Sequence, residues 1–218
     1  MTMGKKNYVI AIAGTSGSGK TVVSAKVSEL LDKAPILAFD DYFEFLEGWP
    51  ENIRDWLDKG ANTDELQNIQ MMNDIKTLKE DKSIIHPTTK ETLHSTGYII
   101  VEDPSGKERK ELAGLIDFLV YIDVPLDIAL MRVLRRFIDN DVKLKDGSIG
   151  KIREEAPDKL LNTIENFLEN YQEYYRELYI VICDRAREKA DFIVDGLQSI
   201  DVLATLVVEQ IANRRVES

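Results

Sequence analysis

The chain has 218 residues, of which 44% are hydrophobic and 31% charged, a composition typical of a soluble globular protein. Its formal net charge of -11 disfavours binding to nucleic acid or to an anionic membrane surface, and no long basic run offsets that charge. The single cysteine, Cys183, excludes an intramolecular disulfide and a thiolate-rich zinc site.

The N-terminal residues carry two lysines and lead into a short apolar stretch at residues 8–13. This stretch is too short to span a membrane, and a glycine loop follows it where a signal peptide would have a cleavage site. We therefore expect a cytoplasmic protein with no membrane partner.

Five short apolar runs are spread along the chain, and none shows a clean alternation with polar residues. Continuous apolar runs of this length are typical of strands that are buried on both faces of a parallel sheet. The runs cover residues 8–13, 36–39, 98–101, 118–122 and 192–194.

Between these runs, apolar residues recur at helical spacing, and we expect helices over residues 21–31, 64–79, 126–138 and 158–180. The alternation of strands and helices predicts an α/β fold with a five-stranded parallel sheet flanked by helices. The last helix carries an apolar stripe that we expect to pack into the core. Its members are Leu161, Ile164, Phe167, Leu168, Tyr171, Tyr175 and Leu178.

Two stretches read as irregular. Residues 47–63 contain both tryptophans, Trp49 and Trp56, whereas residues 140–157 are polar and contain four basic side chains: Lys143, Lys145, Lys151 and Arg153. Long irregular segments in a compact α/β domain are often lids or substrate loops, and the alternative is a solvated surface loop.

Residues 14–21 match the phosphate-binding pattern G-x-x-x-x-G-K-[ST] between an expected strand and an expected helix. Glycines let successive N–H groups point into one concavity, and the dipole of the following helix favours an anion there. In this motif the lysine contacts the β- and γ-phosphates and the last hydroxyl binds Mg²⁺. We therefore predict a P-loop NTPase three-layer fold that binds ATP through Gly14, Thr15, Ser16, Gly17, Ser18, Gly19, Lys20 and Thr21.

Acidic pairs close two of the apolar runs: Asp40 with Asp41, and Glu102 with Asp103. Ligands of open α/β sheets bind beyond the carboxyl ends of the strands, which places these acids beside the phosphate loop. Phosphoryl transfer needs acids that hold Mg²⁺ and accept the proton of the attacking hydroxyl. We therefore expect a kinase that moves the γ-phosphoryl group of ATP to a hydroxyl of a small metabolite.

These motifs resemble the uridine kinase and phosphoribulokinase family of P-loop kinases, which includes nicotinamide riboside kinases. The residues that begin at Asp40 are similar to the family motif D-[SD]-[FY]-[FY], and Glu102 stands where the family has a strand ending in V-[LI]-E-G. The residues from Arg132 to Arg136 are similar to its arginine-bearing lid helix, and residues 190–196 to its last strand. The resemblance spans roughly residues 8–196.

The resemblance implies a role for each matching residue. Asp40 is the expected base, and Thr21, Asp40 and Glu102 are the expected ligands of Mg²⁺. Lys20, with lid arginines such as Arg132 and Arg135, neutralises the group in transfer. For the substrate, the implied contacts are Asp41, Tyr42, His94 and Arg136.

The substrate motif departs from the family pattern. Nucleoside-specific members carry P-x-Y-D-x-x-x-H-S-R before the acidic strand, and here Pro87, His94 and Ser95 keep the register. The Tyr, Asp and Arg positions hold Thr89, Lys90 and Thr96. A stacking ring and a planar cation are therefore missing, which predicts an acceptor other than uridine or cytidine. Trp49 or Trp56 could replace the lost ring, and residues 103–109 form a polar, mobile-looking loop nearby.

We expect one kinase domain over residues 1–218, with a substrate or lid insertion around 44–97 and a lid segment around 132–157. Homo-oligomerisation is compatible with the sequence. A GTPase switch would need an N-K-x-D segment and a transporter subunit an L-S-G-G-Q signature, and the sequence contains neither. The alternative that stays open is a catalytically degenerate ATP-binding sensor or regulatory protein.

Overall fold

The computed structural model describes residues 7–142 and 157–217 of the chain. The part of the expected lid segment with its four basic side chains, residues 143–156, lies outside these ranges. No helix in the described ranges is long and apolar enough to cross a membrane.

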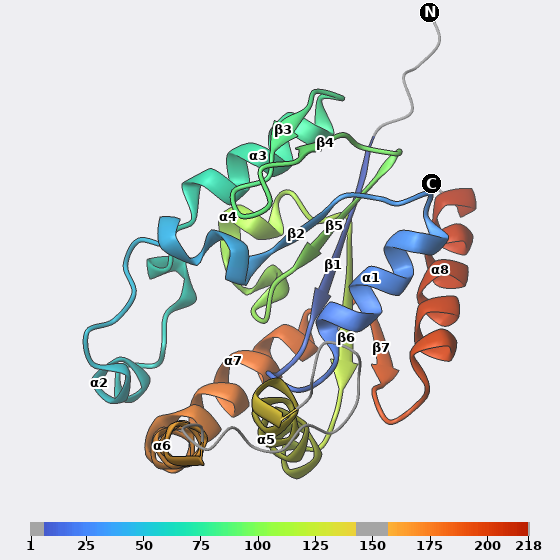
Figure 1. Ribbon diagram of the computed structural model, residues 1–218. Helices are drawn as coiled ribbons and strands as arrows, with labels where there is room; N and C mark the ends of the chain where they lie inside the picture. The colour runs from blue at the N-terminus through green and yellow to red at the C-terminus, as the bar shows by residue number, and fades with distance from the viewer. Residues whose placement is uncertain (1–6, 143–156, 218) are drawn as a thin grey trace, which may run out of the picture.

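The centre of the molecule is a five-stranded sheet in the order β2-β5-β1-β6-β7 (Figure 1). All four neighbouring pairs are parallel, which confirms the predicted fold class. The strands agree with the apolar runs to within a residue or so: β1 Tyr8–Ala13, β2 Ile36–Ala38, β5 Tyr98–Glu102, β6 Phe118–Asp123 and β7 Phe192–Asp195.

Helices cover both faces of the sheet. On one face, α1 (Lys20–Leu30) and α8 (Ile200–Glu217) run side by side, and they bury Val23, Val27, Leu203, Ala204, Val207 and Ile211 (Figure 1). The other face is covered by α3 (Ile69–Lys79), α4 (Lys110–Ala113) and α7 (Arg176–Glu188). A small antiparallel hairpin, β3 (Ile84–Ile85) and β4 (Thr92–Leu93), links α3 to β5.

The segment expected to be irregular contains a short helix, α2 (Ile53–Asp58). Asn52 caps it by accepting a hydrogen bond from the Asp55 N–H, and its residues Trp56 and Leu57 are buried. The segment packs against the N-terminal part of α7 (Figure 1). The expected helix 64–79 is also divided, because Asn68 caps α3 from outside it and a 3₁₀ turn, Thr63–Glu65, precedes it.

One helical rod runs from α6 (Pro157–Asn170) through a turn of π-helix (Tyr171–Tyr175) into α7. The stripe expected in the core is not buried along this rod, since Leu161 is 54% exposed and Leu168 39% exposed. The physical reason is that α6 packs on α5 (Leu126–Val142), away from the sheet. Phe137 and Phe167 form that contact, with ring centroids 5.3 Å apart.

Candidate active site

The phosphate loop joins β1 to α1 and has the backbone that its glycines permit. Gly17 has a φ of +82°, and a Cβ atom there would lie 2.2 Å from the carbonyl oxygen of Ala129 at the start of α5. Only glycine fits this position. The loop is therefore held directly against the helix that carries the lid arginines.

Side chains around the loop are directed at its backbone. The Lys20 ammonium group donates to the carbonyl oxygens of Gly14 (3.1 Å) and Thr15 (3.2 Å). The Thr15 and Ser18 hydroxyls are buried and have no hydrogen-bond partner among the residues described. Buried polar groups normally have partners, so free hydroxyls at this position fit a loop that binds phosphate oxygens.

Thr21 and Glu102 meet at the carboxyl edge of the sheet. The Thr21 hydroxyl donates a 2.8 Å hydrogen bond to Glu102 Oε1. Burial raises the pKa of Glu102, and the nearby carboxylates of Asp40 and Asp41 raise it further, against the opposing effects of Thr21 and Lys20. The structure thus brings four predicted site residues close to Lys20: Thr21, Asp40, Asp41 and Glu102.

The donor set at this point is suited to Mg²⁺. Hydroxyl and carboxylate oxygens are the ligands that this ion prefers, usually together with substrate phosphates. Within residues 7–142 and 157–217, no three His, Cys, Asp or Glu side chains converge as a metal site. A cation here would therefore share Thr21 and Glu102 with phosphate oxygens, as expected for a nucleotide-bound ion.

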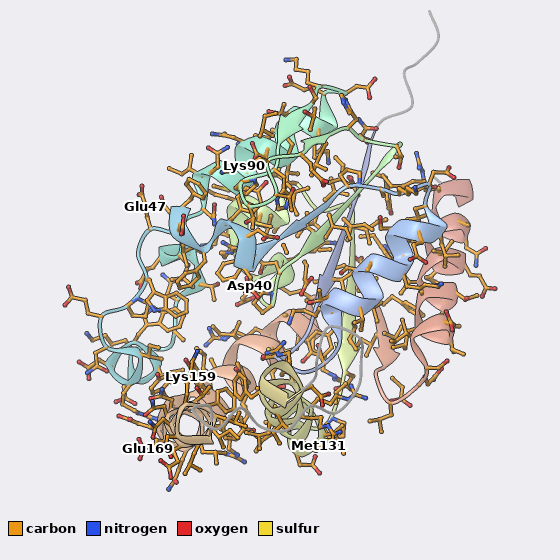
Figure 2. All side chains as sticks on the ribbon, in the orientation of Figure 1. Asp40, Glu47, Lys90, Met131, Lys159 and Glu169 are labelled. Atoms are coloured by element: carbon orange, nitrogen blue, oxygen red, sulfur yellow. The ribbon has the colours of Figure 1, made fainter. Side chains whose placement is uncertain are left out.

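Asp40 lies on a 3₁₀ helix, Phe39–Phe45, that follows β2, and its exposed side chain lies near the centre of the molecule (Figure 2). Asp40 and Ser16 of the phosphate loop line one cavity. The cavity has a volume of about 340 Å³. Asp40, the expected base, and the phosphate loop therefore border the same cavity.

His86 was not identified from the sequence, yet it is the histidine that lies beside the acidic pair. Its Nε2 is 3.6 Å from Asp41 Oδ2. Its Nδ1 accepts from the backbone N–H groups of Thr88 and Thr89, so the proton of the neutral ring lies on Nε2, toward Asp41. His86 directly follows β3 in the loop of the β3–β4 hairpin, whereas His94 directly follows β4.

His94 lies elsewhere. It is exposed and stands just before the N-terminal end of β5, at the edge of the sheet away from the phosphate loop. Lys90, in the same hairpin, lies well away from Asp40 (Figure 2). The structure therefore does not bring His94 to the acidic residues.

Tyr42 is fully buried, and its phenol donates a 2.8 Å hydrogen bond to Asp74 of α3. Burial and this hydrogen bond raise the pKa of Tyr42 well above its ordinary value. The side chain thus anchors the 3₁₀ helix on α3 and does not line the cavity. The neighbouring Asp41 is positioned by this anchor.

The three lid arginines differ in their contacts. Arg132 donates to the carbonyl oxygens of Ser18 (3.3 Å) and Gly196 (3.0 Å), which links α5 to the phosphate loop and to the end of β7. Arg135 is exposed and pairs with Asp139 one turn further along α5 (3.2 Å). Arg136 is also exposed.

The loop expected to be mobile is tightly bonded and includes a buried ion pair. Asp103 is fully buried, accepts hydrogen bonds from the backbone and hydroxyl of Ser105, and pairs with Arg109. The Arg109 guanidinium lies over the Phe39 ring, 5.4 Å from its centroid, and lines the cavity. Asp103 stands where the family has a glycine, and that replacement was the only sequence signal for Arg109.

Comparisons with known proteins find similar kinases. No protein-family model matches the chain. The uridine kinase of Borrelia duttonii is 31% identical over 138 residues, which cover 59% of this chain and 66% of that enzyme. The uridine kinase of Oceanobacillus iheyensis is 29% identical over 178 residues, 74% of this chain and 82% of the enzyme. The chain thus spans just under two thirds of the first of these relatives.

Among solved structures, a protein provisionally named as a fructose transport system kinase from Silicibacter sp. TM1040 matches with a TM-score of 0.50. The identity is 12%, and the match covers 89% of this chain and 92% of that protein, so it shows the fold alone. The strand order is that of a P-loop kinase fold, and the curated matches make the chain similar to uridine kinases over most of its length.

Proposed function

We propose that this protein transfers the γ-phosphoryl group of ATP to a hydroxyl of a small-molecule acceptor. The observation that supports this most strongly is the shared cavity, which is lined by Asp40 and by Ser16 of the phosphate loop. A hydroxyl bound there would lie between a carboxylate that can accept its proton and the loop that holds the phosphates. In-line transfer requires this arrangement.

ATP would bind with its phosphates on the backbone N–H groups of residues 14–21. Thr21 and Glu102, with Asp40 directly or through water, would hold Mg²⁺. The bound ion would neutralise charge on the phosphates and orient them. The 2.8 Å contact between Thr21 and Glu102 supports this set, since two oxygen ligands are already adjacent.

The protein side chains would then share the rest of the work. Asp40 orients the acceptor hydroxyl and takes its proton as the oxygen attacks phosphorus. Lys20 and the lid arginines stabilise the charge that is spread over the transferring group. Arg132 is held on the loop backbone, so its first effect is to fix the loop, whereas Arg135 would act directly after the lid helix approaches the phosphates.

We further propose a single kinase domain in a cytoplasmic protein, with residues 44–97 supplying the wall of the acceptor site. In the described part of that segment, Trp49, Trp56 and Leu66 line the cavity. The hydrogen bonds from Arg185 on α7 to the carbonyl oxygens of Gly60 and Ala61 support the idea, because they fasten the wall to the core.

The test is ADP release from ATP and Mg²⁺ with a panel of alcohols that includes uridine, sugars, polyols and aromatic alcohols. We expect one class of acceptor to raise ADP release. Asp40→Asn should lower that rate on the order of 10²–10⁴-fold while ATP still binds. Glu44→Gln is the matched control, since Glu44 is an exposed carboxylate on the same 3₁₀ helix.

Two results would contradict the proposal. If ATP binds but no acceptor raises ADP release, the protein is better described as a nucleotide-binding sensor. If Asp40→Asn and Glu44→Gln both keep the wild-type rate, Asp40 is not the base.

A further inference from the structure

The acceptor cavity has walls built from aromatic rings. Phe39 and Phe43 come from the 3₁₀ helix, Trp49 and Trp56 from the segment after it, and Tyr175 and Tyr179 from the helical rod. Phe43 and Trp49 are in edge-to-face contact, with centroids 5.3 Å apart. The remaining wall is mostly apolar, with Leu66, Leu178 and Ile182.

We infer that the acceptor is a primary alcohol carried on a flat aromatic or heteroaromatic ring, and this inference rests on the proposed kinase function. Aromatic pairs stabilise binding beyond the contribution of the area they bury. A polyol would instead leave several hydroxyls against apolar walls, where each unpaired hydroxyl costs free energy.

Most polar groups of the walls already have partners. The Trp56 indole N–H donates to Glu65 (2.9 Å), and the Ser105 hydroxyl donates to Asp103. The Tyr179 hydroxyl lies near the Ser16 side chain, which also lines the cavity. Few groups are left to bind the hydroxyls of a sugar, so the walls select for a ring.

Arg109 also lines the cavity. It is 6% exposed, and its Nε atom has no hydrogen-bond partner within the described ranges. Its charge is already balanced by the buried Asp103. Because its charge is already neutralised, Arg109 favours a neutral ring at this wall over a carboxylate or phosphate.

The volume of the cavity is consistent with this class. About 340 Å³ lies at the low end of the range for small-molecule sites, roughly 300–1,000 Å³. Asp40 and Ser16 lie on the same cavity, so a ring held by the aromatic walls would present a short hydroxyalkyl arm to them. A ring with such an arm fits within this volume.

The inference can be tested by calorimetric titration of the full chain, with a non-hydrolysable ATP analogue and Mg²⁺ present. The probes are 3-pyridinemethanol, cyclohexylmethanol as its non-aromatic counterpart, ribose, glycerol and uridine. We expect 3-pyridinemethanol to bind at least about tenfold more tightly than each of the others, the equivalent of two aromatic contacts. Both tryptophans of the chain line the cavity, so its binding should also shift the intrinsic fluorescence.

Variants locate the binding site. Trp49→Leu keeps an apolar side chain but removes the ring, and it should weaken 3-pyridinemethanol about three- to tenfold. Phe45→Leu is the matched control, because Phe45 is an exposed aromatic residue of the neighbouring 3₁₀ helix that does not line the cavity. It should leave the affinity unchanged.

The outcomes separate this inference from the proposed function, because binding is measured without phosphoryl transfer. Tighter binding of ribose, glycerol or uridine would overturn the inference and leave the kinase proposal intact. Failure of 3-pyridinemethanol to bind would also overturn it. Selective binding of 3-pyridinemethanol without acceptor-dependent ADP release would support the ligand class and contradict the kinase proposal.

Discussion

The Thr21 hydroxyl donates a hydrogen bond of 2.8 Å to Glu102, and this contact joins the first turn of α1 to the last residue of β5. It links the phosphate loop to the acidic edge of the sheet through the two oxygens expected to bind Mg²⁺. Removing the hydroxyl should therefore affect metal use more than folding.

Thr21→Ala should reduce turnover on the order of tenfold to a hundredfold, as is typical when support of a metal site is lost. Thr21→Ser keeps the hydroxyl and should retain most activity. The measurement is turnover against Mg²⁺ concentration, and the alanine variant should need more Mg²⁺ for half-maximal rate. Identical Mg²⁺ curves for the two variants would argue against Thr21 as a ligand.

Glu102 should make stability depend on pH. The folded state holds its pKa above the ordinary value of 4.5, mainly by burial, so the folded state binds this proton more tightly than the unfolded state. Stability is then lost as pH rises from about 4.5 through the raised pKa. Glu102→Gln lacks this loss and should have the higher Tm at pH 7, with the difference vanishing below pH 4.

Thermal unfolding across this pH range checks the prediction, since 1 kcal/mol corresponds to about 2–4 °C in a chain of this size. Glu80→Gln is a suitable control. Lys82 lowers the pKa of the exposed Glu80, so its replacement should give no gain at pH 7. A Glu102→Gln protein that is less stable than wild type at pH 7 would contradict the argument.

Gly17→Ala and Gly60→Ala form a matched pair with φ values of +82° and +93°. A Cβ at Gly17 would meet the Ala129 carbonyl at 2.2 Å, whereas a Cβ at Gly60 meets nothing within 4 Å. Gly60→Ala should lower the free energy of unfolding only through backbone strain, by about 1–2 kcal/mol. Gly17→Ala should cost more and should also weaken ATP binding. Equal losses in Tm and equal nucleotide affinities would show that the contact with α5 is unimportant.

Replacing Arg132 and replacing Arg135 should have different effects on stability, ATP affinity and turnover. Arg132→Ala removes one bond to the phosphate loop and one to the backbone at the end of β7, so it should lower both Tm and ATP affinity. Arg135→Ala removes an exposed pair worth at most about 1 kcal/mol, so Tm should hardly change. If Arg135 reaches the transferring group, kcat should fall on the order of 10³-fold or more. An unchanged kcat would remove Arg135 from the mechanism.

Cys183 should be unreactive in the folded protein. It is 3% exposed, and burial raises the pKa of its thiol from 9.0 to about 12, which lowers the thiolate fraction about a thousandfold. Iodoacetamide at pH 7.5 should therefore leave the native protein unmodified and label it fully in urea. Rapid labelling of the native chain, followed by mass spectrometry, would show that the cavity wall opens.

The strands could be predicted from sequence because buried parallel strands leave a direct signature of continuous apolar runs. The phosphate loop was equally visible, since its glycines and lysine occur at fixed spacing. Asp40 and Glu102 could be placed because each follows such a run. These features depend on local sequence, and the structure contains them at the expected residues.

The remaining site residues depend on contacts between distant segments. His94 was favoured by motif spacing, but the pairing of β3 with β4 places His86 beside Asp41. The ion pair of Asp103 and Arg109 joins two residues of a loop whose polar sequence looked solvated. Burial of charged groups is decided by the surrounding fold, so composition alone could not reveal it.

The turn of π-helix at Tyr171–Tyr175 determines how α6 is rotated about the helix axis relative to α7. Each residue of an α-helix advances the azimuth by about 100°. Deleting one residue from the wide turn would thus rotate α6 by about that angle relative to α7. Phe167 would leave Phe137, while Cys183 and Ala186 would keep their places under the sheet. The length of this single turn therefore determines how α6, and with it the contact to α5, is oriented relative to the sheet.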